Sequence, residues 1–342
     1  MPRSTINLLT TGLLVAMLAL LGGGRATAQE RLEVAYIPIL PMAQLFVMQG
    51  EGWTEEAGLD LELTRFSSGP AIVQAIASGR FDVMYFGIGP AMVARANGVP
   101  IKVVAANVVE QIALVARGRF AEIMRDAESP AAGVRAFAEE TGREPAIASL
   151  PRGSVPDTVL RYWLTEVAGI DPEDVDIKGM GADKVQQAML ARSVDAASIL
   201  EPIVTIIQSR LDDAHVVAAG GEMLPDQPGA VVAVREDLVA ERPEVVAKLV
   251  ALHQRATELL NTEPRRAARH VHTAIGQGLI PLQTIEDALG SSYGRFVADP
   301  RTIVAATATM HDFARELGTL PRPVPLADLF EPRFYEAATA VR

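Results

Sequence analysis

The chain has 342 residues, of which 49% are hydrophobic and 21% are charged, and its formal net charge is −11. This composition is typical of a globular protein of about two domains. Aromatic residues make up only 5% of the chain, and an acidic balance disfavours contact with nucleic-acid phosphates. Length, composition and charge therefore argue against a nucleic-acid-binding protein.

The first 28 residues differ in kind from the rest. Arg3 precedes an apolar run at 8–21, and Ala26-Thr27-Ala28 stands directly before Gln29. A basic start, an apolar centre and a small-residue end predict a secretory signal peptide that is cleaved after Ala28. A membrane span needs roughly 20 apolar residues, and this run is shorter. Cysteine is absent, so we expect neither disulfides nor a lipid anchor, and the pattern indicates a soluble protein of the bacterial periplasm.

Strands and helices alternate along the rest of the chain. The first group is a strand at 31–37, a helix at 42–49, strands at 59–66, 81–86 and 101–106, and helices that begin near 69 and 90. Past Asn107 the pattern restarts, with strands at 146–149, 175–177, 194–200 and 215–219 and helices at 154–167, 183–192 and 203–211. A strand at 230–234, a long helix up to Pro264 and a helical tail complete the chain. This alternation predicts parallel α/β sheets with helices on both faces.

Two consecutive units place small residues between the end of a strand and the start of a helix. The segments are FSSGPAIVQAIASG, which contains Ser67 and Ser68, and FDVMYFGIGPAMVARANG, which contains Ile88 and Gly89. A helix N-terminus carries unpaired N–H groups and suits a small anion. For one such turn taken alone, plain helix capping without a ligand is the favoured explanation. Because the carboxyl ends of parallel strands meet at one crevice, two such turns together favour a binding site.

A third helix start lies in the second group of elements. Arg152, Gly153 and Ser154 follow the strand at 146–149, and an arginine offers planar donors to an oxyanion. A surface arginine that pairs with Asp157 or contacts solvent is the alternative. Glu201 ends the strand at 194–200, where it could accept hydrogen bonds from a ligand amine, pair with Arg152 or interact with a helix dipole.

Catalytic motifs are missing from the sequence. GIGPAM has Met92 where a dinucleotide fingerprint needs its third glycine. His270 and His272 are two residues apart, so they cannot share a helix face for a metal ion. The chain also lacks cysteine and the HExxH and GxSxG patterns. We therefore expect no enzyme, no cofactor and no metal.

In order and spacing, several segments resemble the periplasmic solute-binding proteins of ABC importers for sulfonates, taurine and nitrate, a family that includes binders of pyrimidine thiamine precursors. The segments that carry the resemblance are EVAYIPILPMAQLFVMQGEGW, the stretch from FSSGPAIV to KVVAAN, PRGSVPDTVLRYWL, SVDAASILEP and RPEVVAKLVALH. They cover nearly the whole mature chain.

The resemblance implies a type II periplasmic binding protein fold, with two doubly wound α/β domains and a ligand cleft between them. Domain I would comprise 29–107 and 230–342, and domain II would comprise 108–229, joined by crossing strands near 107–115 and 230–234. Carried over by position, the implied ligand-binding residues are Leu40, Pro41, Ser67, Ser68, Ile88, Gly89, Asn107, Arg152, Gly153, Ser154 and Glu201.

The implied function is capture of a small organic anion of sulfonate or taurine type, by hinge closure, for an ABC permease in the inner membrane. The receptor is expected to be a monomer. A carboxylate or a pyrimidine heterocycle stays open as the ligand, and a ligand sensor for a signalling receptor would share these features. The pyrimidine-making enzymes related to this family depend on a cysteine-rich motif, which this chain lacks.

Overall fold

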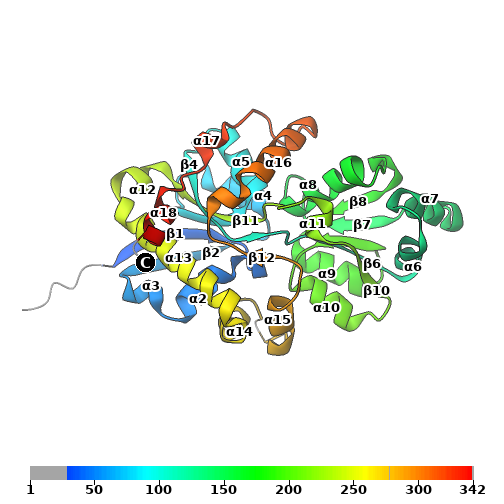
Figure 1. The fold of residues 1–342 in the computed structure, drawn as a ribbon, viewed down its shortest axis with the longest axis horizontal. Helices are drawn as coiled ribbons and strands as arrows, with labels where there is room; N and C mark the ends of the chain where they lie inside the picture. Colours follow the sequence, from blue (N-terminus) through cyan, green and yellow to red (C-terminus); the bar gives the residue numbers. More distant parts are fainter. Residues whose placement is uncertain (1–28, 277, 341–342) are drawn as a thin grey trace, which may run out of the picture.

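Two α/β halves lie side by side along the long axis of the molecule (Figure 1). The structure is a computed structural model, and it describes residues 29–276 and 278–340. The signal peptide predicted at 1–28 lies outside the described residues.

The first half contains a five-stranded sheet in the order β2-β1-β3-β11-β4. Its strands are β1 (Glu30–Tyr36), β2 (Leu59–Arg65), β3 (Val83–Gly87), β4 (Ile101–Ala106) and β11 (Ala230–Arg235). β1 pairs in parallel with β2 and β3, and β11 pairs antiparallel with β3 and β4. All but the last residue of β3 and of β11 are buried, because helices cover both faces of this sheet.

The helices of the first half come from both ends of the chain. They are η1 (Leu40–Met42), α2 (Ala43–Gly50), α3 (Trp53–Glu56), α4 (Gly69–Ile76), α5 (Ile88–Ala96), α12 (Glu236–Glu241), α13 (Pro243–Thr262), α14 (Pro264–Val271), η5 (Pro300–Ile303), α16 (Val304–Glu316), α17 (Leu326–Leu329) and α18 (Arg333–Ala340). α13 packs against α2 and α18, and α5 packs against α4 and α16.

The second half repeats this topology. Its sheet has the order β10-β6-β9-β7-β8, built from β6 (Ala113–Arg117), β7 (Ala146–Ser149), β8 (Asp176–Gly179), β9 (Ala196–Ile199) and β10 (Ala214–Ala218). Its helices are α6 (Gly118–Asp126), α7 (Pro130–Thr141), α8 (Val155–Tyr162), η2 (Trp163–Val167), η3 (Pro172–Asp174), α9 (Ala182–Leu190), α10 (Ile203–Arg210) and α11 (Gly220–Met223). In each sheet, the strand that arrives from the other half is the antiparallel one.

The chain crosses between the halves after β4 and again before β11. β5 (Val108–Val109) lies in the first crossing, where the Glu110 N–H donates to the Gln227 carbonyl at 2.8 Å and the Gly229 N–H donates to the Val108 carbonyl at 3.1 Å. These hydrogen bonds join the two crossing segments, which we call the hinge. The domain division at 107/108 and 229/230 stays a prediction.

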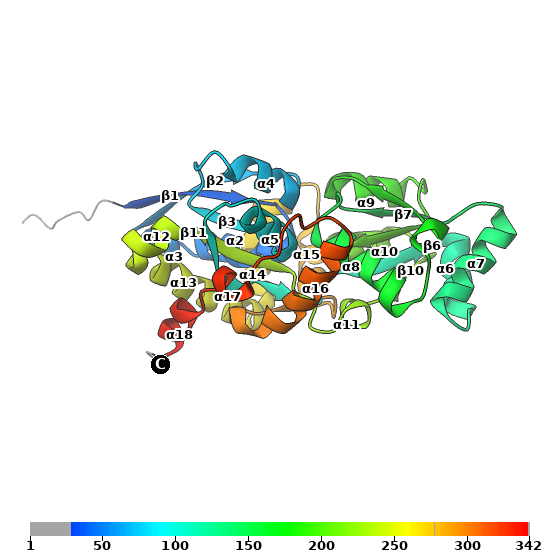
Figure 2. The ribbon, with the colours of Figure 1, turned by 90° about the horizontal axis from the view of Figure 1, so that it is seen from above.

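A third segment reaches this hinge from the C-terminal part of the chain. β12 (Arg295–Phe296), which the sequence pattern did not predict, pairs with β5. Before it come η4 (His272–Gly276) and α15 (Leu282–Leu289), and α15 packs against α10 of the second half. Figure 2 shows α16 next to α8 at the same junction. The tail therefore contacts both halves.

Candidate functional site

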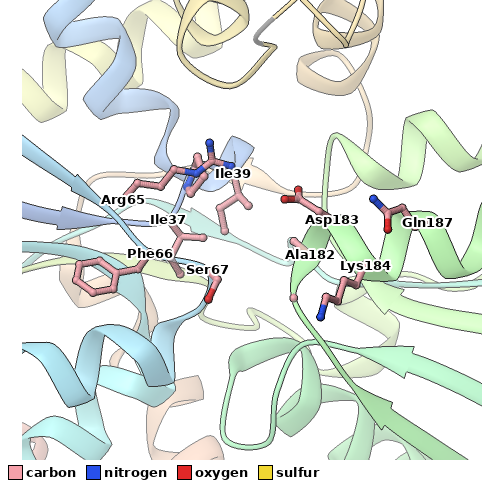
Figure 3. A pocket seen from close by; sticks show the side chains of 11 residues that line it. Ile37, Ile39, Arg65, Phe66, Ser67, Ala182, Asp183, Lys184 and Gln187 are labelled. Atoms are coloured by element: carbon pink, nitrogen blue, oxygen red, sulfur yellow. The ribbon is translucent and has the colours of Figure 1, made fainter.

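A cavity of about 540 Å³ lies between the two halves (Figure 3). The first half supplies the segments that follow β1 and β2, and the second half supplies the first turns of α9. The lining residues are Ile37, Pro38, Ile39, Arg65, Phe66, Ser67, Gly181, Ala182, Asp183, Lys184 and Gln187. We call this space the outer cavity. Its size suits a small organic ligand.

Two basic side chains and one acidic side chain line the outer cavity. Arg65 and Lys184 are exposed, and neither has an ion pair or a side-chain hydrogen bond to any other residue that the structure describes. Asp183 extends across the cavity toward Ile39, whereas the Phe66 ring points away from it (Figure 3). The lining thus carries a net positive charge, to which the N–H groups at the start of α9 add.

A second, much smaller cavity of about 20 Å³ adjoins the outer one. Ile37 and Ile39 line both spaces, and this middle cavity also touches Met42, Gly69, Gly87, Pro90, Gln111, Leu150, Ser154, Val155, Pro156, Leu200 and Ala230. A Cβ built on Gly87 would lie 2.7 Å from Val155 Cγ2. The halves are therefore in direct contact here.

The predicted helix starts of α5 and α8 face each other at this contact. A Cβ built on Gly89 would lie 3.4 Å from the Gly153 carbonyl oxygen. Ser154 caps α8 by accepting from the Asp157 N–H at 3.4 Å, and the Gly153 N–H donates to the Asp157 carboxylate at 3.1 Å. Asp157 pairs with Arg161 at 2.9 Å. The α8 start is thus already supplied with acceptors from its own chain.

An innermost cavity of about 20 Å³ lies next to the hinge. Its lining residues are Leu40, Pro41, Val108, Gln111, Glu201, Ala288, Leu289, Tyr293, Gly294 and Phe296. Leu40, Pro41 and Glu201 were predicted as ligand-binding residues, and the structure brings them together in this space. Gln111 lines both the middle and the innermost cavity.

Glu201 is a buried carboxyl group, with 2% of its surface exposed. Its oxygens accept from the Thr205 N–H at 3.0 Å and the Thr205 hydroxyl at 2.9 Å. Burial raises the pKa of Glu201, while hydrogen bonds from Thr205 and Ser291 oppose that rise. No ion pair joins Glu201 to Arg152 in the described part of the chain.

Arg152 is not among the residues that line the three cavities. Its side chain is exposed, and its guanidinium donates to the carbonyl of Leu317 at 3.0 Å, just beyond α16. Neither the pairing with Asp157 nor a place in the cleft is seen. The role that the sequence suggested for Arg152 in anion binding stays a prediction.

The remaining predicted residues support the cleft walls. Ser67 lines the outer cavity, and Ser68 caps α4 by accepting from the Ala71 N–H at 3.4 Å. Ile88, which is fully buried, donates its N–H to the Gly229 carbonyl at 3.0 Å. Asn107 is also fully buried, and its amide donates to the Pro41 carbonyl at 3.1 Å. Asn107 therefore fixes the loop that carries Pro41.

Sequence reasoning missed Arg65, Lys184 and Gln111. Arg65 is the last residue of β2, and Lys184 lies in the first turn of α9. Both positions are at strand-to-helix connections, which was the signal used for the other candidates. Among the described residues, no group of three or more histidine, aspartate or glutamate side chains is placed to hold a metal ion. No helix of the described ranges is long and apolar enough to cross a membrane.

Among the solved structures with a similar architecture are two that are named as binding proteins. The nitrate-binding protein NrtA of Synechocystis PCC 6803 has a TM-score of 0.75 at 15% identity, over 91% of this chain and 88% of that one. The alkanesulfonate-binding protein SsuA of Xanthomonas axonopodis pv. citri has a TM-score of 0.69 at 18% identity, over 90% of this chain and 100% of that one. The class is thus the two-domain α/β fold of periplasmic binding proteins, as the sequence predicted.

The model of the NMT1-like family matches residues 25–275, and the chain belongs to that family. A protein of Brucella abortus, provisionally named as a binding protein, is 29% identical over 219 residues. This match takes in 64% of the chain and 62% of the relative, so the chain spans about 62% of the relative's length. The predicted resemblance to binding proteins is confirmed for family and fold, and the named fold neighbours are binding proteins rather than enzymes.

Proposed function

We propose that the chain is the periplasmic solute-binding component of an ABC importer and that it holds a small organic anion between its two halves. The observation that carries this proposal is the outer cavity of about 540 Å³, to which both halves contribute. A ligand that touches both walls stabilises the closed arrangement more than the open one. The closed form is then what a permease would bind.

Charge supports an anion as the ligand. Arg65 and Lys184 stand on opposite walls without partners in the described part of the chain, and a charge-assisted hydrogen bond is stronger than a neutral one. The overall negative charge does not oppose this, because exposed charges are screened beyond about 10 Å. A sulfonate or a carboxylate meets the requirement equally well.

Two alternatives keep a physical basis. The carboxyl of Glu201 is buried and has a raised pKa, which would suit a hydrogen bond to an uncharged heterocycle such as a pyrimidine. A sensor that docks on a signalling receptor would use the same cleft. A ligand panel distinguishes an uncharged heterocycle from an organic anion. Binding to purified permease or to purified receptor distinguishes an importer component from a sensor.

Isothermal titration calorimetry of cleft variants tests the anion proposal. The double substitution Arg65→Met and Lys184→Met is expected to weaken binding of an organic sulfonate or carboxylate at least tenfold, since each removed ionic hydrogen bond contributes about 1.5–3 kcal/mol. Arg152→Met is the matched control. A loss caused by Arg152→Met and not by the double substitution would place the anion at the α8 start instead.

A further inference from the structure

The three cavities of the cleft form a row that ends at the hinge. Ile37 and Ile39 are shared by the outer and the middle cavity, and Gln111 is shared by the middle and the innermost cavity. Neighbouring cavities of the row therefore share wall residues from the outer cavity, which Arg65 and Lys184 line, to the innermost one, which Gln111 lines.

Gln111 is a buried residue of the hinge with an unpaired side-chain oxygen. Only 4% of its surface is exposed, and its Oε1 atom has no hydrogen-bond partner in the described part of the chain. A Cβ built on Gly229 would lie 2.6 Å from the Gln111 Cδ, so the carboxamide rests on the returning hinge strand. Leaving a buried carbonyl oxygen unpaired is unfavourable, and each such group calls for an explanation.

A neighbouring glutamine shows what a purely structural role looks like at the same hinge. Gln227 is fully buried. Its Oε1 accepts from the Ile112 N–H at 3.3 Å, and its Nε2 donates to the Pro228 carbonyl at 3.2 Å. Both polar atoms of Gln227 are used within the chain, whereas the Gln111 oxygen is left for a partner from outside it.

Glu201 lines the innermost cavity together with Gln111. Gln111 lies just before β6 and Glu201 follows β9, its neighbour in the sheet, and most of the other lining side chains are apolar, among them Leu40 and Phe296. The residues that line this cavity include no cation. A space of about 20 Å³ has room for one group of the size of a water molecule.

We propose that Gln111 is a specificity-determining residue, which with Glu201 accepts hydrogen bonds from a hydroxyl or amino group at the end of the ligand remote from its acid. This inference rests on the proposed function and narrows its substrate class to organic anions with a hydrogen-bond donor at the far end. A site built to bind a donor rejects the analogue that lacks it, because its buried acceptors are then left unpaired.

Paired probes in calorimetric titrations test the proposal. The pairs are 3-hydroxypropanesulfonate with propanesulfonate, 4-hydroxybutanoate with butanoate, and 4-hydroxybenzoate with benzoate. We expect the full chain to bind the hydroxylated member of at least one pair tenfold or more tightly than its partner. Gln111→Leu should abolish this preference and leave the affinity for the plain acid unchanged. Its melting temperature without ligand should not fall, because an unpaired buried oxygen has been removed.

Gln187→Leu is the matched control, since Gln187 lines only the outer cavity of the three. It should leave the preference for the hydroxylated probe intact. If Gln111→Leu does not fold, Gln111→Asn serves in its place, because its side chain is shorter by one methylene and moves the carboxamide oxygen out of reach of the ligand. Equal affinities within every pair would overturn the inference and leave anion binding standing. The same holds if the Gln111 variant still prefers the hydroxylated probe. Failure of every probe to bind would overturn both.

Discussion

His253 provides a quantitative test of how the first half is packed behind the cleft. This α13 residue is fully buried, its Nε2 lies 2.8 Å from the Ala106 carbonyl oxygen, and its ring centroid lies 6.0 Å from that of Tyr85. Burial lowers the pKa of His253 from 6.5 to about 4. Between these values, the unfolded chain binds a proton that the folded chain does not.

The sign of the resulting pH effect follows from this difference. Stability is fully present above pH 6.5 and falls as the pH drops toward 4, because the unfolded state takes up the proton first. With pKa values of 6.5 and about 4, the loss on going from pH 7.5 to pH 4.0 corresponds to about 3 kcal/mol. That is a large part of the 5–15 kcal/mol by which folded proteins are typically stable.

Urea unfolding at the two pH values measures this loss. His253→Gln stays uncharged and keeps a side-chain N–H, so its unfolding free energy should fall by about 3 kcal/mol less than that of the parent chain. His215→Gln, at an exposed position of β10, is the control and should behave like the parent chain. An acid sensitivity in His253→Gln equal to that of the parent chain would refute the packing of α13 against β4.

Three further predictions concern the cleft walls. Ser68→Ala removes the cap of α4 and should lower the unfolding free energy by about 1 kcal/mol in urea titrations, and no loss would contradict the capping role. Gly87→Ala places a methyl group 2.7 Å from Val155 Cγ2, so it should hold the halves apart and weaken ligand binding. Solution scattering of the liganded chain should then show a larger radius of gyration. An unchanged radius of gyration and an unchanged affinity would contradict this. Because the folded chain holds the Glu201 proton more tightly than the unfolded chain does, stability contributed by Glu201 falls as pH rises above 4.5. The melting temperature of Glu201→Gln minus that of the parent chain should therefore be larger at pH 8 than at pH 4.5. An equal difference at both pH values would contradict the raised pKa.

Much of the fold could be predicted because periodicity is a local property. The strands expected at 101–106 and 146–149 have those bounds as β4 and β7. The helix expected at 154–167 is interrupted, since α8 passes into η2 at Trp163. The strand β12 has two residues and pairs with β5, nearly 190 positions earlier in the chain. Nothing in its own composition indicates that pairing.

The candidate site was less predictable, because cavities depend on how the halves pack. The turn at 152–154 was correctly placed at the start of a helix, but the direction of the Arg152 side chain is set by Leu317, 165 residues away. The position of Glu201 at the end of a strand was predicted, whereas its burial depends on segments from the C-terminal tail. Arg65 and Lys184 line one cavity only because the end of β2 and the start of α9 lie on its two sides.

A thermal-shift panel on this chain tests the central claim most directly. The panel contains alkyl and aryl sulfonates, aliphatic and aromatic carboxylates, nitrate, and uncharged pyrimidines. A ligand at 100 times its Kd adds about 2.7 kcal/mol to the unfolding free energy, which is readily visible as a raised Tm. The account predicts a raised Tm with organic sulfonates or carboxylates and none with uncharged pyrimidines. A shift with uncharged pyrimidines alone, or with no compound of the panel, would contradict it.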